Sequence, residues 1–129
     1  MSYEHILVAV DLSQSSQIVI DKAVSLAKGT NCKLSFVNVG VNRVVLEQKE
    51  KLTLEKELQA LAEKCSHPVT DTFVVVGDLH IKLSGIVKEM DIDLVVCGHH
   101  HKFFSRLFSS VPKLANAVEA DLLVVYLKQ

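Results

Sequence analysis

The chain has 129 residues, of which 49% are apolar and 22% are charged, the balance of an ordinary globular domain rather than of a disordered or fibrous chain. Its 14 basic residues stand against 15 acidic ones, a formal net charge of −1, so no overall positive field attracts nucleic acid or an anionic membrane. We therefore expect one domain spanning residues 1–129, with neither nucleic acid nor a membrane as a partner.

The three cysteines, Cys32, Cys65 and Cys97, lie in apolar segments and form no CxxC pair. We expect them to be reduced thiols of the core. The first residues lack the basic segment and long apolar run of a secretory signal, and no apolar run approaches the roughly 20 residues of a membrane span. The sequence thus predicts a cytoplasmic protein.

Short apolar runs alternate with helical patterns along the chain. The runs predict strands at residues 5–10, 32–39, 72–76, 94–97 and 121–127. Apolar spacing predicts a first helix that stops at Gly29, a second over residues 43–65, a third from Leu79 to Met90, and a fourth that begins near Pro112. Because the strands are mostly continuous apolar runs, they need helices on both faces, which predicts a doubly wound parallel α/β sheet.

Ligands of such sheets bind beyond the carboxyl ends of the strands, where the strand order reverses. Those ends carry Asp11, Val39, Gly77 and Gly98. Any ligand site is therefore expected at this edge.

Three histidines in a row, His99, His100 and His101, follow the fourth apolar run, where the pattern predicts a polar loop. Consecutive residues of an extended loop point in alternating directions, so three in a row rarely surround one ion, and no cysteine pair adds ligands. His5 and His80 remain as more distant ligands, but we expect no metal site. No Gly-x-Ser-x-Gly turn presents a serine, so no catalytic residue is expected either.

The segment FFSRLF gives one apolar face if it forms a turn or two of helix, through Phe103, Phe104, Leu107 and Phe108. One interpretation is that this face folds back over the end of the sheet and fills the space of a nucleotide. The other is an exposed patch that contacts another protein.

Four segments in order, HILVAVDLSQSS, VVVGDLHIKL, DIDLVVCGHHH and ADLLVVYL, resemble the universal stress protein family over essentially the whole chain. The resemblance implies a Rossmann-like fold, similar to the adenine nucleotide alpha hydrolases, with a five-stranded parallel sheet of order 3-2-1-4-5. It also implies a non-enzymatic protein without a cofactor that contributes to survival under starvation, oxidative damage or other stress.

Nucleotide-binding members of that family carry Gly-x-x-Gly, nine further residues, and then Gly-Ser or Gly-Thr. Here Gly98 matches the first position, but His101, Val111 and Pro112 occupy the other three. Pro112 also lacks an N–H group to give to an anion. The chain therefore resembles the A-type members, which are generally regarded as not binding ATP.

The alternative is a nucleotide-binding regulatory module that uses a degenerate phosphate loop. Asp11 matches the acidic residue that such members direct toward the nucleoside, although an Asp between a strand and a helix also serves as a helix cap. In this alternative the binding residues are Asp11, Val39, Gly98, Ser109 and Ser110.

The last predicted strand contains six apolar residues in a row, 122–127. In the 3-2-1-4-5 order it lies at the edge of the sheet, where open N–H and C=O groups invite aggregation unless they are covered. Antiparallel pairing with a second copy covers them, and the resemblance implies the same homodimer. The expected interface is Leu123, Val124, Val125, Tyr126 and Leu127, with heterodimers of related stress proteins as a further expectation.

Overall fold

The computed structural model describes residues 3–10, 16–40, 48–76, 79–100 and 119–127. Its elements in chain order are β1 (His5–Ala9), α1 (Ser16–Ala27), β2 (Lys33–Gly40), α2 (Gln48–Lys64), β3 (Val69–Val76), α3 (Leu79–Met90), β4 (Leu94–His100) and β5 (Asp121–Leu127). The predicted fourth helix and the FFSRLF segment lie outside the described residues.

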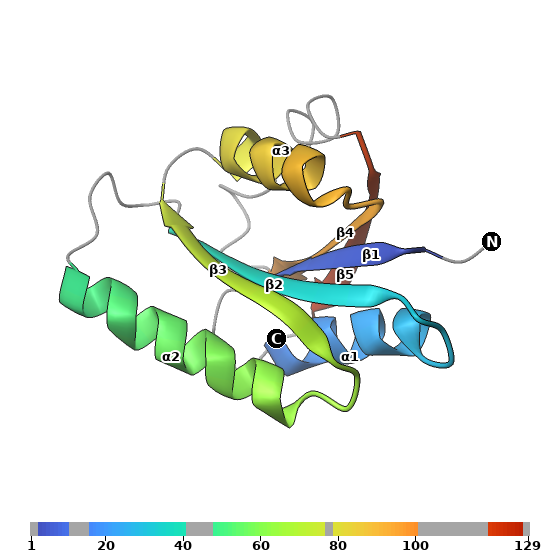
Figure 1. Cartoon of the computed structure of the whole chain (residues 1–129), viewed down its shortest axis with the longest axis horizontal. Coiled ribbons are helices and arrows are strands. Elements are labelled where there is room, and N and C mark those ends of the chain that lie inside the picture. The colour runs from blue at the N-terminus through green and yellow to red at the C-terminus, as the bar shows by residue number, and fades with distance from the viewer. Residues whose placement is uncertain (1–2, 11–15, 41–47, 77–78, 101–118, 128–129) are drawn as a thin grey trace.

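The strands form one sheet in the order β3-β2-β1-β4-β5, and every neighbouring pair is parallel. Figure 1 shows α1 and α2 on one face of this sheet and α3 on the opposite face. The predicted fold class, strand order and two-sided helix cover are therefore confirmed.

Alternation along the strands divides the core into two layers. Ile6 and Val8 of β1 face the layer of α1 and α2, where they meet Ile20 and Leu58, while Leu7 faces α3. β2, β4 and β5 follow the same alternation, and β3 follows it from Phe73 to Val75, because successive side chains of a strand point to opposite faces. The continuous apolar runs of the sequence arise from this two-sided burial.

Two helices end through residues in the left-handed backbone region. Gly29 follows α1 with φ 80°, and the Thr30 N–H donates to the Ala27 carbonyl at 3.1 Å. Asp91 follows α3 with φ 52°, and the Ile92 N–H donates to the Val87 carbonyl at 3.0 Å. These bonds satisfy carbonyls that have no partner within the helix.

Two strands are longer than predicted. β3 begins at Val69 rather than at residue 72, and its pairing with β2 shifts register between Leu34 and Ser35. β4 continues through His100, so residues 99 and 100 belong to a strand and not to the predicted loop. Polar residues are accommodated here because backbone pairing with β2 and β5 does not depend on side-chain hydrophobicity.

Candidate functional site

The carboxyl edge of the sheet has its reversal of strand order at β1, which lies between β2 and β4. The backbone leaves β1 through Val10, whose N–H donates to the Val37 carbonyl at 2.8 Å. The Val10 carbonyl accepts a 2.8 Å bond from Nδ2 of Asn38, a side chain that is only 8% exposed. The N–H and the carbonyl of Val10, the residue before Asp11, are therefore both hydrogen-bonded to β2.

Two of the five residues predicted for a bound nucleotide lie among the described residues, and both are at this edge. Val39 is near the end of β2, and Gly98 is in β4 opposite Val125. Asp11, Ser109 and Ser110 lie outside the described residues, as do His101, Val111 and Pro112. The fold therefore brings Val39 and Gly98 to the same edge on either side of β1.

His5 does not share a site with the histidines of β4. It begins β1, at the opposite end of the sheet from His99, and six strand residues separate the two levels by roughly 20 Å. Its ring nitrogens contact the Met90 carbonyl and the Ser35 hydroxyl. In the described part of the chain, no three His, Cys, Asp or Glu side chains are grouped as metal ligands.

The amino edge of the sheet contains a chain of polar contacts that leads from the buried His5 and Ser35 to the exposed Thr70. His5 Nδ1 lies 3.0 Å from the carbonyl oxygen of Met90, the last residue of α3, and Nε2 lies 2.8 Å from Ser35 Oγ. Ser35 Oγ is in turn 3.1 Å from Thr70 Oγ1. The Ser35 and His5 pair has the spacing of a nucleophile and its base, but Ser35 is 0% exposed and no substrate can reach it. This cluster therefore joins β1, β2, β3 and α3 structurally.

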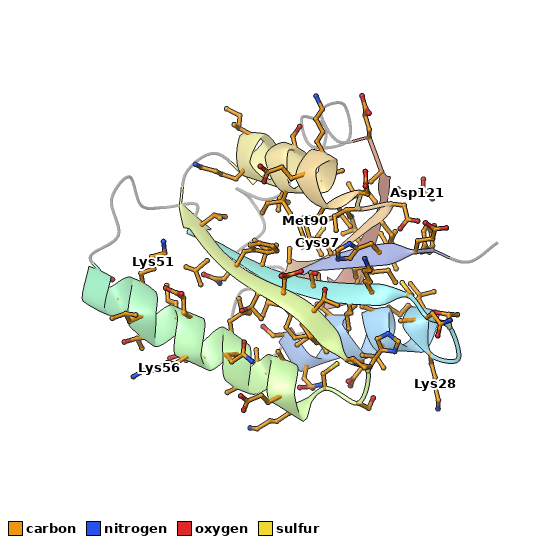
Figure 2. The ribbon with its side chains drawn as sticks, viewed as in Figure 1. Lys28, Lys51, Lys56, Met90, Cys97 and Asp121 are labelled. Atoms are coloured by element: carbon orange, nitrogen blue, oxygen red, sulfur yellow. The ribbon has the colours of Figure 1, made fainter. Side chains whose placement is uncertain are left out.

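At the same edge, Asp93 and Asp121 accept hydrogen bonds from residues at and before the start of the central strand β1. The Asp93 carboxylate accepts bonds from the N–H groups of Glu4 at 2.8 Å and His5 at 3.0 Å. The Tyr3 hydroxyl donates to the Asp121 carboxylate at 2.8 Å, and Figure 2 labels Asp121 at the start of β5. This bond, together with slight desolvation and the charges of Asp121 and Asp93, raises the pKa of Tyr3.

The three cysteines are free thiols, as predicted. Cys32 and Cys97 are buried, whereas Cys65 is partly exposed. Burial raises the pKa of the Cys97 thiol to about 11, and burial followed by the charge of Asp93 raises that of Cys32. Neither buried thiol has the depressed pKa of a reactive cysteine.

β5 is the outermost strand on its side of the sheet, and Leu122, Leu123, Val124 and Val125 are partly exposed. The Asp121 N–H donates to the Asp93 carbonyl at 3.0 Å, so Asp121 directs its backbone groups toward β4. Backbone groups of successive strand residues point to alternate sides. The residues of β5 whose N–H and C=O groups point away from the sheet are therefore Leu122, Val124 and Tyr126.

The sequence analysis missed the hydrogen-bonding roles of the buried residues His5, Ser35 and Asn38 and of the partly exposed Asp93. A usable signal was present, because Ser35 and Asn38 interrupt the apolar run LSFVNV, and a buried polar side chain needs a partner. The partners themselves come from residues 28 to 89 positions away, which no local pattern contains.

The parallel strand order and the helices on both faces define the class of Rossmann-like α/β proteins. A family model described as the universal stress protein family matches residues 2–126, and the chain belongs to that family. It is 41% identical to universal stress protein A of Escherichia coli (strain K12), with 99% of this chain and 97% of the relative covered.

Solved structures of the family share the fold. The crystal structure of a universal stress protein in complex with cAMP has a TM-score of 0.73 and 25% identity, and covers 98% of both chains. The universal stress protein from Archaeoglobus fulgidus in complex with dAMP has a TM-score of 0.74 and 16% identity, covering 97% of this chain and 99% of that one. Among the described residues, no helix is long and apolar enough to cross a membrane.

Proposed function

We propose that this chain is a non-enzymatic, homodimeric stress protein of the A type that contributes to survival through protein contacts. The observation that carries the proposal is its 41% identity, over nearly its whole length, to universal stress protein A. Its departure from the phosphate-binding glycine pattern at His101, Val111 and Pro112 supports the same assignment.

The chemistry of the described residues is consistent with a protein that acts without catalysis. Their Ser35 and His5 pair is buried, and burial raises rather than lowers the pKa of Cys97. Three free thiols fit a reducing compartment, which supports a cytoplasmic location.

The outer side of β5 supports the proposed homodimer. A partly exposed strand without a charged side chain in residues 122–127 presents a row of backbone donors and acceptors. A second copy satisfies those groups with its own identical row. Related stress proteins with a similar last strand would form mixed dimers in the same way.

A second candidate function is the binding of an adenine nucleotide. The observation in its favour is the cAMP complex of a family member with 25% identity. A single phosphate needs fewer backbone N–H groups than a triphosphate does. The degenerate phosphate loop therefore hinders the binding of cAMP less than the binding of ATP. In this candidate Asp11, Val39, Gly98, Ser109 and Ser110 form the site.

Parallel calorimetric titrations with ATP and cAMP test both candidates. The leading proposal predicts no binding heat with either nucleotide at micromolar protein. Saturable heat with cAMP, abolished by Asp11→Ala without loss of thermal stability, would establish the second candidate. Survival of a starved deletion strain, compared with and without the gene restored, tests the stress role.

A further inference from the structure

We propose that the carboxyl half of β3 binds an extended segment of a partner protein in which apolar and basic residues alternate. The inference rests on the protein contacts proposed above and gives them a surface. That surface is separate from β5, because β3 and β5 are the two outermost strands of the sheet.

The outer side of β3 presents open backbone groups. Among the described strands, β3 pairs only with β2, so alternate residues of β3 direct their N–H and C=O groups away from the sheet. The Val37 carbonyl accepts the Val10 N–H, so Val37 directs its backbone groups toward β1 and its neighbour Phe36 directs them toward β3. Phe36 lies opposite Thr72 and therefore bonds to the residues on either side of it. The outward-directed residues of the carboxyl half are consequently Thr72, Val74 and Val76.

The amino half of β3 is less suited to a further strand. Its pairing with β2 shifts register between Leu34 and Ser35, and such irregularities interrupt regular pairing at the edge of a sheet. Asp71 follows this shift and adds a charged side chain, which also discourages pairing. From Thr72 to Val76 the pairing with β2 is regular. A partner strand is therefore expected along this carboxyl half.

The two faces beside this edge differ in character. On the side of α3, Phe73 and Val75 are apolar and partly exposed. On the side of α2, the Thr72 hydroxyl donates to Gln59 Oε1 at 3.4 Å, so the helix face that carries Gln59 borders the outer edge of β3. Because side chains of a strand alternate, an added strand would direct every second residue toward each of these faces.

Negative charge predominates on the helix face that carries Gln59. Glu55 and Glu63 lie four residues before and after Gln59, so the three side chains share this face, and all three are exposed. Figure 2 shows Lys56 on the side of α2 that is turned away from β3, and Lys51 lies in the first turn of the helix. Basic side chains of an added strand complement the acidic face, while its apolar side chains meet the side of α3.

The same charges disfavour a second copy of this chain as the occupant. Two copies paired through β3 about a two-fold axis would set their acidic α2 faces side by side, and like charges in an interface oppose binding. Leu52 lies seven residues before Gln59 on this face and is 52% exposed. It offers an apolar contact to the aliphatic stem of a lysine or arginine. These features favour a basic segment of a different protein.

Fluorescence anisotropy with two labelled peptides tests the inference. Each peptide is about six residues long, enough to span the carboxyl half of β3. One alternates lysine with valine, and the other alternates glutamate with valine. The lysine peptide should bind saturably and the glutamate peptide should not. Absent binding of the lysine peptide, or equal binding of both, would overturn the inference, whereas the stress role is tested separately by survival.

Charge reversal on α2 tests the position of the site. The double variant Glu55→Lys, Glu63→Lys turns two attractions into repulsions and should weaken binding of the lysine peptide about tenfold. The control Glu57→Lys, Glu119→Lys makes the same change in net charge at exposed positions away from this edge and should weaken binding much less. Equal weakening in both variants would show that the peptide responds only to overall charge, which would contradict a site at β3.

Amide hydrogen exchange locates the bound peptide. The outward amides of Thr72, Val74 and Val76 should gain protection when the lysine peptide is added, whereas those of Phe73 and Val75 already bond to β2 and should not change. Protection of β5 in place of β3 would overturn the inference. Protection of β3 on concentrating the protein without peptide would assign the edge to a second copy instead. Sedimentation of the free chain tests the β5 homodimer independently, and a monomer there leaves the β3 site standing.

Discussion

His5 shows how much of the fold depends on single buried polar side chains. It is 4% exposed, and its two ring nitrogens contact the Met90 carbonyl and Ser35 Oγ. A His5→Phe substitution keeps an aromatic ring but leaves both groups without that partner. Because burying an unpaired polar group costs free energy, we expect a loss of about 2 kcal/mol in the free energy of unfolding, measured by urea denaturation.

Ser35→Ala provides the matched control for His5. The His5→Phe change should cost less in the Ser35→Ala background than in the wild type, because one of the two orphaned groups is already gone. Equal costs in both backgrounds would show that the 2.8 Å contact contributes nothing to stability.

Ionisation of the buried Cys97 thiol should make the stability of the fold fall at alkaline pH. Burial raises the pKa of its thiol from 9.0 to about 11, so the unfolded chain releases this proton at lower pH than the folded chain does. The buried, protonated thiol contributes its full stabilisation below pH 9. As pH rises toward 11 this stabilisation is lost, and the free energy of unfolding falls by about 2 kcal/mol. Thermal unfolding at pH 8 and at pH 10.5 measures this loss of stability. Between the same two pH values, the Cys97→Ala variant should lose less stability than the wild type.

Two glycines give opposite predictions at the scale of the element. Gly85 lies exposed in the middle of α3, and an added Cβ would meet no atom within 4 Å. Gly85→Ala should therefore stabilise the protein by about 0.5–1 kcal/mol through better helix propensity. Gly29→Ala should destabilise it by about 1 kcal/mol, because φ at residue 29 is 80°. Urea midpoints that shift in the same direction for both variants would be inconsistent with these backbone conformations.

The elements were predictable where one periodicity dominated. Continuous apolar runs gave β1 and β5, and the spacing of Leu83 and Val87 gave α3. The ends of β3 and β4 were not predictable, because Asp71 and His99 pair through their backbone and carry no apolar signal. Strand ends depend on the length of the neighbouring strand, which lies far away in the sequence.

At the scale of the whole molecule, the position of the candidate site was predictable and its detailed contacts were not. Parallel strands bring their carboxyl ends together, so Val39 and Gly98 could be assigned to one edge from the order of the elements alone. The bond from Asn38 to the Val10 carbonyl could not be predicted, because it depends on the register of β1 with β2.

Proline substitutions distinguish the two sides of β5. Val124→Pro removes an outward N–H group and leaves the ladder with β4, so we expect a folded monomer. Val125→Pro removes an N–H group that faces β4 and should lower the thermal stability of the chain itself. Sedimentation velocity and thermal denaturation measure both variants. A Val124→Pro protein that remains a dimer would show that β5 is not the interface.

A native mass spectrum of the freshly purified, unmodified protein tests the central claim most directly, because it reports assembly and bound ligand together. We predict a species of twice the 14.3 kDa chain mass, with no added mass from a nucleotide. A monomer, or a species that carries the mass of ATP or a nucleoside monophosphate, would contradict it.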